Sequence, residues 1–259
     1  MAITETASSA AVKTRPAYKI GGGLMWFGVA VLVLVVIAAF WRIYLDTFGL
    51  AMGMDATSPE FQSIWMRMLY IEIPVILAAS IACWTYLIMT RDRNLAAITP
   101  EVEFKRYYYV TLWLVAYTVA VAPVGFWTAS DATWHQMAMR DTAFTPTHII
   151  LFYGMIPLYV FFGVGAFIYA MTRTPIFANG ISFMFVLAVV GPFLVLPNVG
   201  FNEWGHSFWL TEEFFAHPLH WGFVALGVSA LALAGVAAQI AMRLKDLFPI
   251  VFKLDKTHA

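Results

Sequence analysis

Long apolar stretches alternate along the chain with short segments in which the polar residues gather. A helix needs roughly 20 mostly apolar residues to cross a lipid bilayer, and several of these stretches reach that length. The pattern therefore predicts an all-α fold, a polytopic transmembrane helical bundle. About six spans are expected, at residues 22–44, 64–90, 107–129, 147–171, 181–201 and 217–242.

The expected spans form one domain, because the chain shows neither an internal repeat nor a low-complexity linker between them. The domain covers residues 22–242, between an N-terminal tail at 1–21 and a C-terminal tail at 243–259. The N-terminal tail lacks the apolar core and cleavage site of a signal peptide. The fifth span is the least regular, because Pro192 and Pro197 within it interrupt helical hydrogen bonding.

Composition supports a membrane protein and excludes several classes of function. Hydrophobic residues make up 61% of the chain and charged residues only 12%, whereas a soluble domain is about 25% charged. The net charge is zero, so nothing indicates nucleic-acid binding. The single cysteine, Cys83, excludes an internal disulfide and any cysteine-rich metal site.

Lysine and arginine are distributed unevenly between the two ends of the expected spans. Short cytoplasmic loops of membrane proteins carry an excess of these cations. Six alternating spans place 12 of the 15 cations on one side and three on the other, and both termini lie on the cation-rich side. Both termini are therefore predicted to be cytoplasmic. The segments expected to face the periplasm or an equivalent lumen are 45–63, 130–146 and 202–216.

A first polar cluster, SDATWHQMAMRDTAFTPTHI, occupies residues 130–149 between the third and fourth spans. Asp131 and His135 are four residues apart, so on a helix they share one face. Pro146 favours a turn and a new helix start, which can return His148 to that face. Two imidazoles and one carboxylate would make a facial ligand set that leaves positions open on a metal. Thr145 and Thr147 flank this proline, and either of them could cap the new helix.

A second cluster, NEWGHSFWLTEEFFAHPLHW, repeats the plan at residues 202–221. Asn202 and His206 are again four residues apart, and a neutral amide replaces the carboxylate of the first cluster. The spacing leaves open whether His217 or His220 supplies the third ligand, because both lie near the start of the sixth span. This second site would be less negative and would hold its metal more weakly.

The two clusters admit more than one chemistry. Two histidines with a carboxylate fit non-haem iron best, with zinc and copper as alternatives. A histidine near a membrane interface is also often only a hydrogen-bonding partner of its neighbours. The second cluster holds three carboxylates that are candidates for proton handling or for a solvated loop: Glu203, Glu212 and Glu213.

Two further features lie near the same predicted side of the membrane. Glu72 lies inside the second span, and we expect it to pair with Arg67, with a role in proton or quinol contact as the alternative. A set of tryptophans is expected to form an aromatic belt at the interface, with a wall around an apolar cavity as the alternative. These tryptophans are Trp127, Trp134, Trp204, Trp209 and Trp221.

The two clusters, together with the segment RDRNLAAITPEVEFKRYYYV at 91–110, resemble the C subunit of particulate methane monooxygenase and of its relative, ammonia monooxygenase. The resemblance covers nearly the whole chain, and both clusters match in residue type, spacing and order. It implies copper as the metal. One implied copper site comprises Asp131, His135 and His148. A neighbouring site comprises Asn202, His206 and His220, so the resemblance selects His220 over His217.

The resemblance also implies an assembly and a reaction. The assembly is a trimer of three-subunit protomers with partner subunits A and B, in a bacterial inner or intracytoplasmic membrane. The reaction is the oxidation of methane to methanol with dioxygen, with quinol as the electron donor. Catalysis is expected at the site of Asn202, His206 and His220, or between the two sites. Ammonia oxidation is an alternative, and so is a structural, copper-holding subunit whose partner performs the chemistry. A transporter is disfavoured, because the first, fourth and sixth spans lack a polar path.

Overall fold

A computed structural model describes residues 23–137, 144–194 and 218–252 of the chain. Within these ranges the fold is an all-α bundle, and five helical segments are long and apolar enough to cross a membrane. The long helices are α1 (Gly23–Met52), α3 (Arg67–Met89), α4 (Pro100–Met137), α6 (Ile156–Arg173) and α11 (Pro218–Phe252). The short elements are α2 (Pro59–Phe61), η1 (Gln62–Met66), η2 (Leu95–Ala97), α5 (Pro146–His148), η3 (Ile149–Met155), α7 (Pro175–Ala178), α8 (Phe183–Val190) and η4 (Gly191–Leu194).

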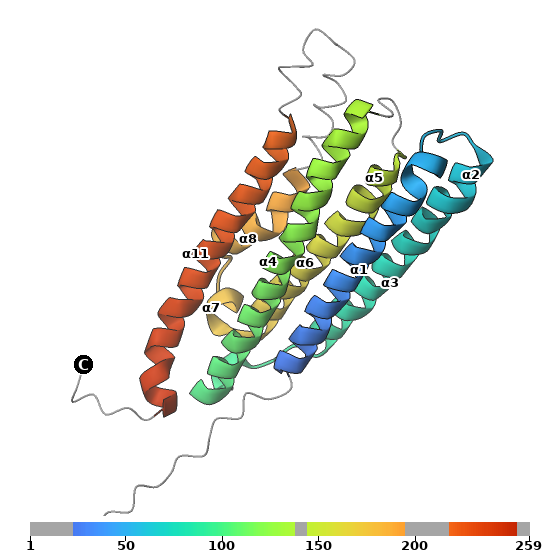
Figure 1. The fold of residues 1–259 in the computed structure, drawn as a ribbon. Coiled ribbons are helices and arrows are strands. Elements are labelled where there is room, and N and C mark those ends of the chain that lie inside the picture. Colours follow the sequence, from blue (N-terminus) through green and yellow to red (C-terminus); the bar gives the residue numbers. More distant parts are fainter. Residues whose placement is uncertain (1–22, 138–143, 195–217, 253–259) are drawn as a thin grey trace, which may run out of the picture.

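The long helices lie nearly side by side, as Figure 1 shows: α1 and α4 run in one direction, and α3, α6 and α11 run in the other. The start of α1 and the end of α11 lie at the same end of the bundle, together with the start of α4. The opposite end holds the last turn of α4, helix α5 and the start of α11. These directions agree with those expected for the first four spans and the sixth, and the five long apolar segments indicate a multi-pass membrane protein.

The helices differ from the expected spans in their lengths. Helix α1 continues to Met52 and α11 to Phe252, beyond the expected ends at residues 44 and 242. The expected fifth span, 181–201, begins as the eight-residue helix α8 and the 3₁₀ turn η4, and its remaining residues lie outside the described ranges. For α1 and α11 hydropathy ended the span too early, because a helix continues past the apolar run wherever its backbone hydrogen bonds can.

Close packing between α4 and α6 forms the centre of the bundle. The rings of Tyr117 and Tyr159 stack with their centroids 4.2 Å apart, and both side chains are buried. Two glycines of α6 permit this approach, because a Cβ on Gly163 would lie 2.7 Å from the Tyr117 ring and a Cβ on Gly165 2.6 Å from the indole of Trp113. Small residues at helix contacts let transmembrane backbones approach closely.

Polar contacts connect α11 to the rest of the bundle. Arg243 donates two hydrogen bonds of 2.8 Å to the two carboxylate oxygens of Glu103, near the start of α4. Glu103 is only 5% exposed, so this bidentate pair neutralises a buried charge. Ser182, which caps α8, donates a 2.7 Å hydrogen bond to Gln239 of α11. Helix α8 is therefore attached to α11.

We predict that Gly165→Ala destabilises the assembled protein by about 1–3 kcal/mol, because the added methyl would overlap the rigid indole of Trp113. Gly125→Ala is the matched control, since no atom lies within 4 Å of its added Cβ. Thermal unfolding of the complex in lipid measures the difference. Equal midpoints for the two variants would show that the close approach at Gly165 is not required.

Candidate functional site

Asp131 and His148 meet at the end of the bundle where α4 finishes and α5 begins. The Nε2 atom of His148 lies 3.4 Å from the Oδ2 atom of Asp131, and each residue is 5% exposed. The two residues are 17 positions apart and approach because α4 and the following segment run in opposite directions. The tertiary structure thus brings together two members of the first predicted ligand set.

The local sequence explains how His148 is positioned. Thr145 has an extended backbone, and its hydroxyl accepts a 3.0 Å hydrogen bond from the backbone N–H of His148. Pro146 occupies the first helical position, where its missing N–H costs nothing. Of the two expected capping residues, Thr145 is the cap, and the hydroxyl of Thr147 lies 3.3 Å from the hydroxyl of Thr145.

The Asp131–His148 pair has donor chemistry that fits a metal ion. The Oδ1 atom of Asp131 is buried and has no hydrogen-bond partner among the described residues. A buried carboxylate oxygen without a partner is costly, so it favours a cation. Two donor atoms that each lie about 2.1 Å from the same metal ion are about 3.0–3.4 Å from each other when the donor–metal–donor angle is roughly 90–109°. The observed separation of 3.4 Å is consistent with shared coordination.

The other predicted ligands are described only in part. His135 lies in α4 one turn beyond Asp131, and His220 lies in the first turn of α11, but the side chains of both are outside the described residues. Asn202 and His206 also lie outside them. Among the side chains that the structure describes, which include neither His135 nor His220, no three of His, Cys, Asp or Glu gather as a metal site.

Buried tryptophans surround this end of the bundle. Trp127 and Trp134 are 0% and 7% exposed, so the expected aromatic belt is wrong for these two residues, which pack inside the bundle. Trp65, from η1, is also fully buried. The three indole N–H groups have no acceptor among the described residues. Trp127 and Trp134 belong to the last turns of α4, the helix that carries Asp131.

The end of α1 contributes to the same packing through two glycines. A Cβ on Gly49 would lie 3.0 Å from the ring of Trp134, and a Cβ on Gly53 would lie 2.6 Å from Pro146. Helix α1 therefore approaches both segments that hold the Asp131–His148 pair. Sequence reasoning missed these two positions, although glycines close to the end of an apolar helix are a signal for close contact.

Glu72 does not pair with Arg67 as expected. Arg67 is exposed, and no ion pair joins the two residues. The Glu72 carboxyl instead faces Gly154, where an added Cβ would lie 3.0 Å from its Oε2 atom, and its Oε1 atom has no hydrogen-bond partner among the described residues. Gly154 belongs to the π-helical segment η3 that follows His148, and such segments are frequent at functional sites.

These features define a class: an all-α, multi-pass membrane protein with a buried carboxylate and imidazole at one end of its bundle. The family model that describes the C subunit of ammonia monooxygenase/methane monooxygenase matches residues 4–251. The chain therefore belongs to that family and is one of the subunits of a monooxygenase. A comparison with curated proteins gave no match.

We predict that Thr145→Val weakens the position of His148, because valine keeps the shape and removes the acceptor for its N–H. A lost helix cap costs about 1 kcal/mol. The matched control is Thr133→Val, since Thr133 is exposed and its hydroxyl only returns to the Ala129 carbonyl. Resistance of the metal content of the purified complex to a chelator is the measurement. Equal retention in both variants would contradict the role of the cap.

Proposed function

We propose that the chain is the C subunit of a copper-dependent methane monooxygenase. The observation that carries the proposal is the buried Asp131–His148 pair, with one carboxylate oxygen unpartnered among the described residues, in a member of this family. Two neighbouring copper sites are proposed at this end of the bundle. Their ligands are Asp131, His135 and His148 for the first site and Asn202, His206 and His220 for the second.

The two proposed sites differ in charge. Asp131 adds a negative charge and would hold its metal firmly, whereas Asn202 adds a neutral amide oxygen and would hold its metal less firmly. Copper held by the imidazoles of His206 and His220 would supply redox chemistry toward dioxygen. We therefore assign the oxidation to the site of Asn202, His206 and His220.

The chain's own residues create the conditions that an apolar substrate needs. Methane partitions into lipid, and the apolar helices bring it to the end of the bundle without passage through water. Buried Trp65, Trp127 and Trp134 keep the Asp131 neighbourhood dry. Glu72 is buried in α3 and forms no ion pair with a described residue, so it is a candidate for holding a proton or contacting quinol.

We further propose that the chain works in a complex with partner subunits and with a defined orientation in the membrane. Subunits A and B complete the protomer, and three protomers form the complex in a bacterial inner or intracytoplasmic membrane. Both termini are cytoplasmic, so the metal sites lie toward the periplasmic or lumenal face. The full reduction of dioxygen takes four electrons. Methane provides two of them when it is oxidised to methanol, and quinol provides the other two.

Asp131→Asn and Asn202→Ala test the two sites separately. Each variant is expected to lose a distinct copper signal in electron paramagnetic resonance. Copper affinity is expected to fall at least roughly tenfold, because even the loss of a residue that only hydrogen-bonds to a metal ligand has an effect of this size. Asn202→Ala is also expected to abolish turnover. The matched controls are Asp46→Asn and Asn179→Ala, which make the same changes at exposed positions.

The measurement is copper per assembled complex together with methane and ammonia turnover in lipid. Unchanged copper and turnover in both variants would overturn the proposal and direct the chemistry to a partner chain. Copper loss with turnover that falls only in proportion to assembly would support a structural, copper-holding role. Faster turnover of ammonia than of methane would reassign the substrate.

A further inference from the structure

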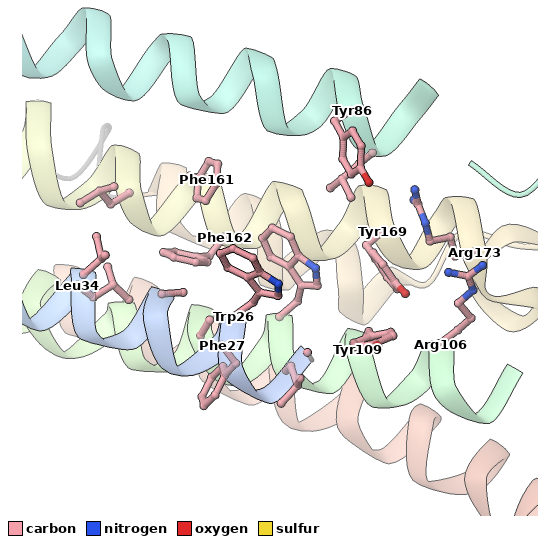
Figure 2. A pocket seen from close by; sticks show the side chains of 18 of the residues that line it. Trp26, Phe27, Leu34, Tyr86, Arg106, Tyr109, Phe161, Phe162, Tyr169 and Arg173 are labelled. Atoms are coloured by element: carbon pink, nitrogen blue, oxygen red, sulfur yellow. The ribbon is translucent and has the colours of Figure 1, made fainter. Parts of the chain in front are cut away.

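A cavity of about 890 Å³ lies between α1, α3, α4 and α6, far from the Asp131–His148 pair. It occupies the end of the bundle where α1 and α4 begin and where α3 and α6 finish, as Figure 2 shows in close view. Pockets for small ligands have volumes of roughly 300–1,000 Å³, so this cavity is large enough for one. Its lining has a polar end and an apolar end.

Two arginines form the polar end of the cavity. Arg106 of α4 pairs with Asp92, with its Nη2 atom 3.0 Å from the carboxylate. Arg173, at the end of α6, donates hydrogen bonds of 2.7 and 2.6 Å to the hydroxyls of Thr172 and Thr90. Figure 2 shows the side chains of both arginines at the same end of the cavity.

Among the described residues, the two arginines at this end share a single carboxylate in an ion pair, that of Asp92. Arg173 is 4% exposed, and no carboxylate of the described residues forms an ion pair with it. The guanidinium lies over the ring of Tyr169, 4.9 Å from its centroid, which stabilises a cation only in part. The Nε atom of Arg106 is buried and also lacks an acceptor there. Asp92 thus faces two guanidinium groups, and a buried unpaired cation is costly.

The other end of the cavity is apolar and aromatic. Phe161 and Phe162 of α6 line it together with Trp26, Phe27 and Leu34 of α1. Helix α1 packs on one side only, and Trp26 is 67% exposed. A molecule in the surrounding bilayer therefore has lateral access along α1. The lining suits a hydrocarbon chain that extends away from the arginines.

We propose that this cavity binds an anionic phospholipid, with its phosphodiester at Arg173 and Arg106 and an acyl chain along the apolar end. The guanidinium fork matches phosphate oxygens, and a phosphate supplies the missing negative charge. Basic pockets between transmembrane helices suit anionic lipid headgroups. A quinol would fit the apolar end, but its neutral headgroup would leave the charge of Arg173 uncompensated.

The test uses the intact complex, purified in detergent and then supplied with phosphatidylglycerol or phosphatidylcholine. Wild type is expected to retain phosphatidylglycerol in preference to phosphatidylcholine, and Arg173→Gln is expected to weaken this binding at least about tenfold, the effect of one lost charge-assisted hydrogen bond. Arg93→Gln is the matched control, because it removes an exposed cation from the same end. Bound lipid per complex is measured by mass spectrometry.

A second variant addresses the apolar end and keeps the test valid if Arg173→Gln fails to assemble. Ala30→Phe adds a ring at a cavity-lining position of α1 and leaves both arginines in place. It is expected to reduce retained phosphatidylglycerol as well. Equal retention in wild type, Arg173→Gln and Ala30→Phe would overturn the proposal. Equal binding of the two lipids, or displacement of phosphatidylglycerol by a quinone analogue, would also overturn it and would assign the cavity to a neutral ligand.

Discussion

The antiparallel contact between α4 and the segment from α5 to α6 positions the other elements of the bundle. The stacked rings of Tyr117 and Tyr159 lie in it, and the hydroxyl of Tyr117 also donates to the carbonyl of Ala188 in α8. Glycines at 163 and 165 bring the two backbones together. With no water in the bilayer to drive association, this close fit between side chains determines which helices meet.

The same contact places a polar site at each end of the bundle. In α4, 25 residues separate Arg106 from Asp131, and 25 residues separate His148 from Arg173 in the antiparallel partner. At 1.5 Å per residue this separation is about 37 Å, somewhat more than the roughly 30 Å of bilayer hydrocarbon. The Asp131–His148 pair and the arginine cavity therefore belong near opposite interfaces, where charged groups are tolerated more easily than at the centre.

Much of this arrangement was predictable from the chain. Apolar runs predicted the first four spans and the sixth, and the directions in which these helices run agree with the expected order of spans. The spacing of Asp131, Pro146 and His148 predicted a turn that returns the imidazole to the carboxylate, and the two side chains do meet. These predictions succeeded because each depends on short-range properties: hydropathy along one helix, residue spacing on one face, and a proline with a capping threonine at a helix start.

The order of residues was enough to establish a membrane-spanning helical bundle and the places of its ligand-type residues along the chain. Which faces meet depended instead on tertiary packing. That packing turned Glu72 toward Gly154 and not toward Arg67, and it buried Trp127 within the protein. It also left Arg173 without an ion pair among the described residues, beside a cavity. Transmembrane helices are apolar on every side, so hydropathy does not identify the inward face, whereas packing between neighbouring helices does.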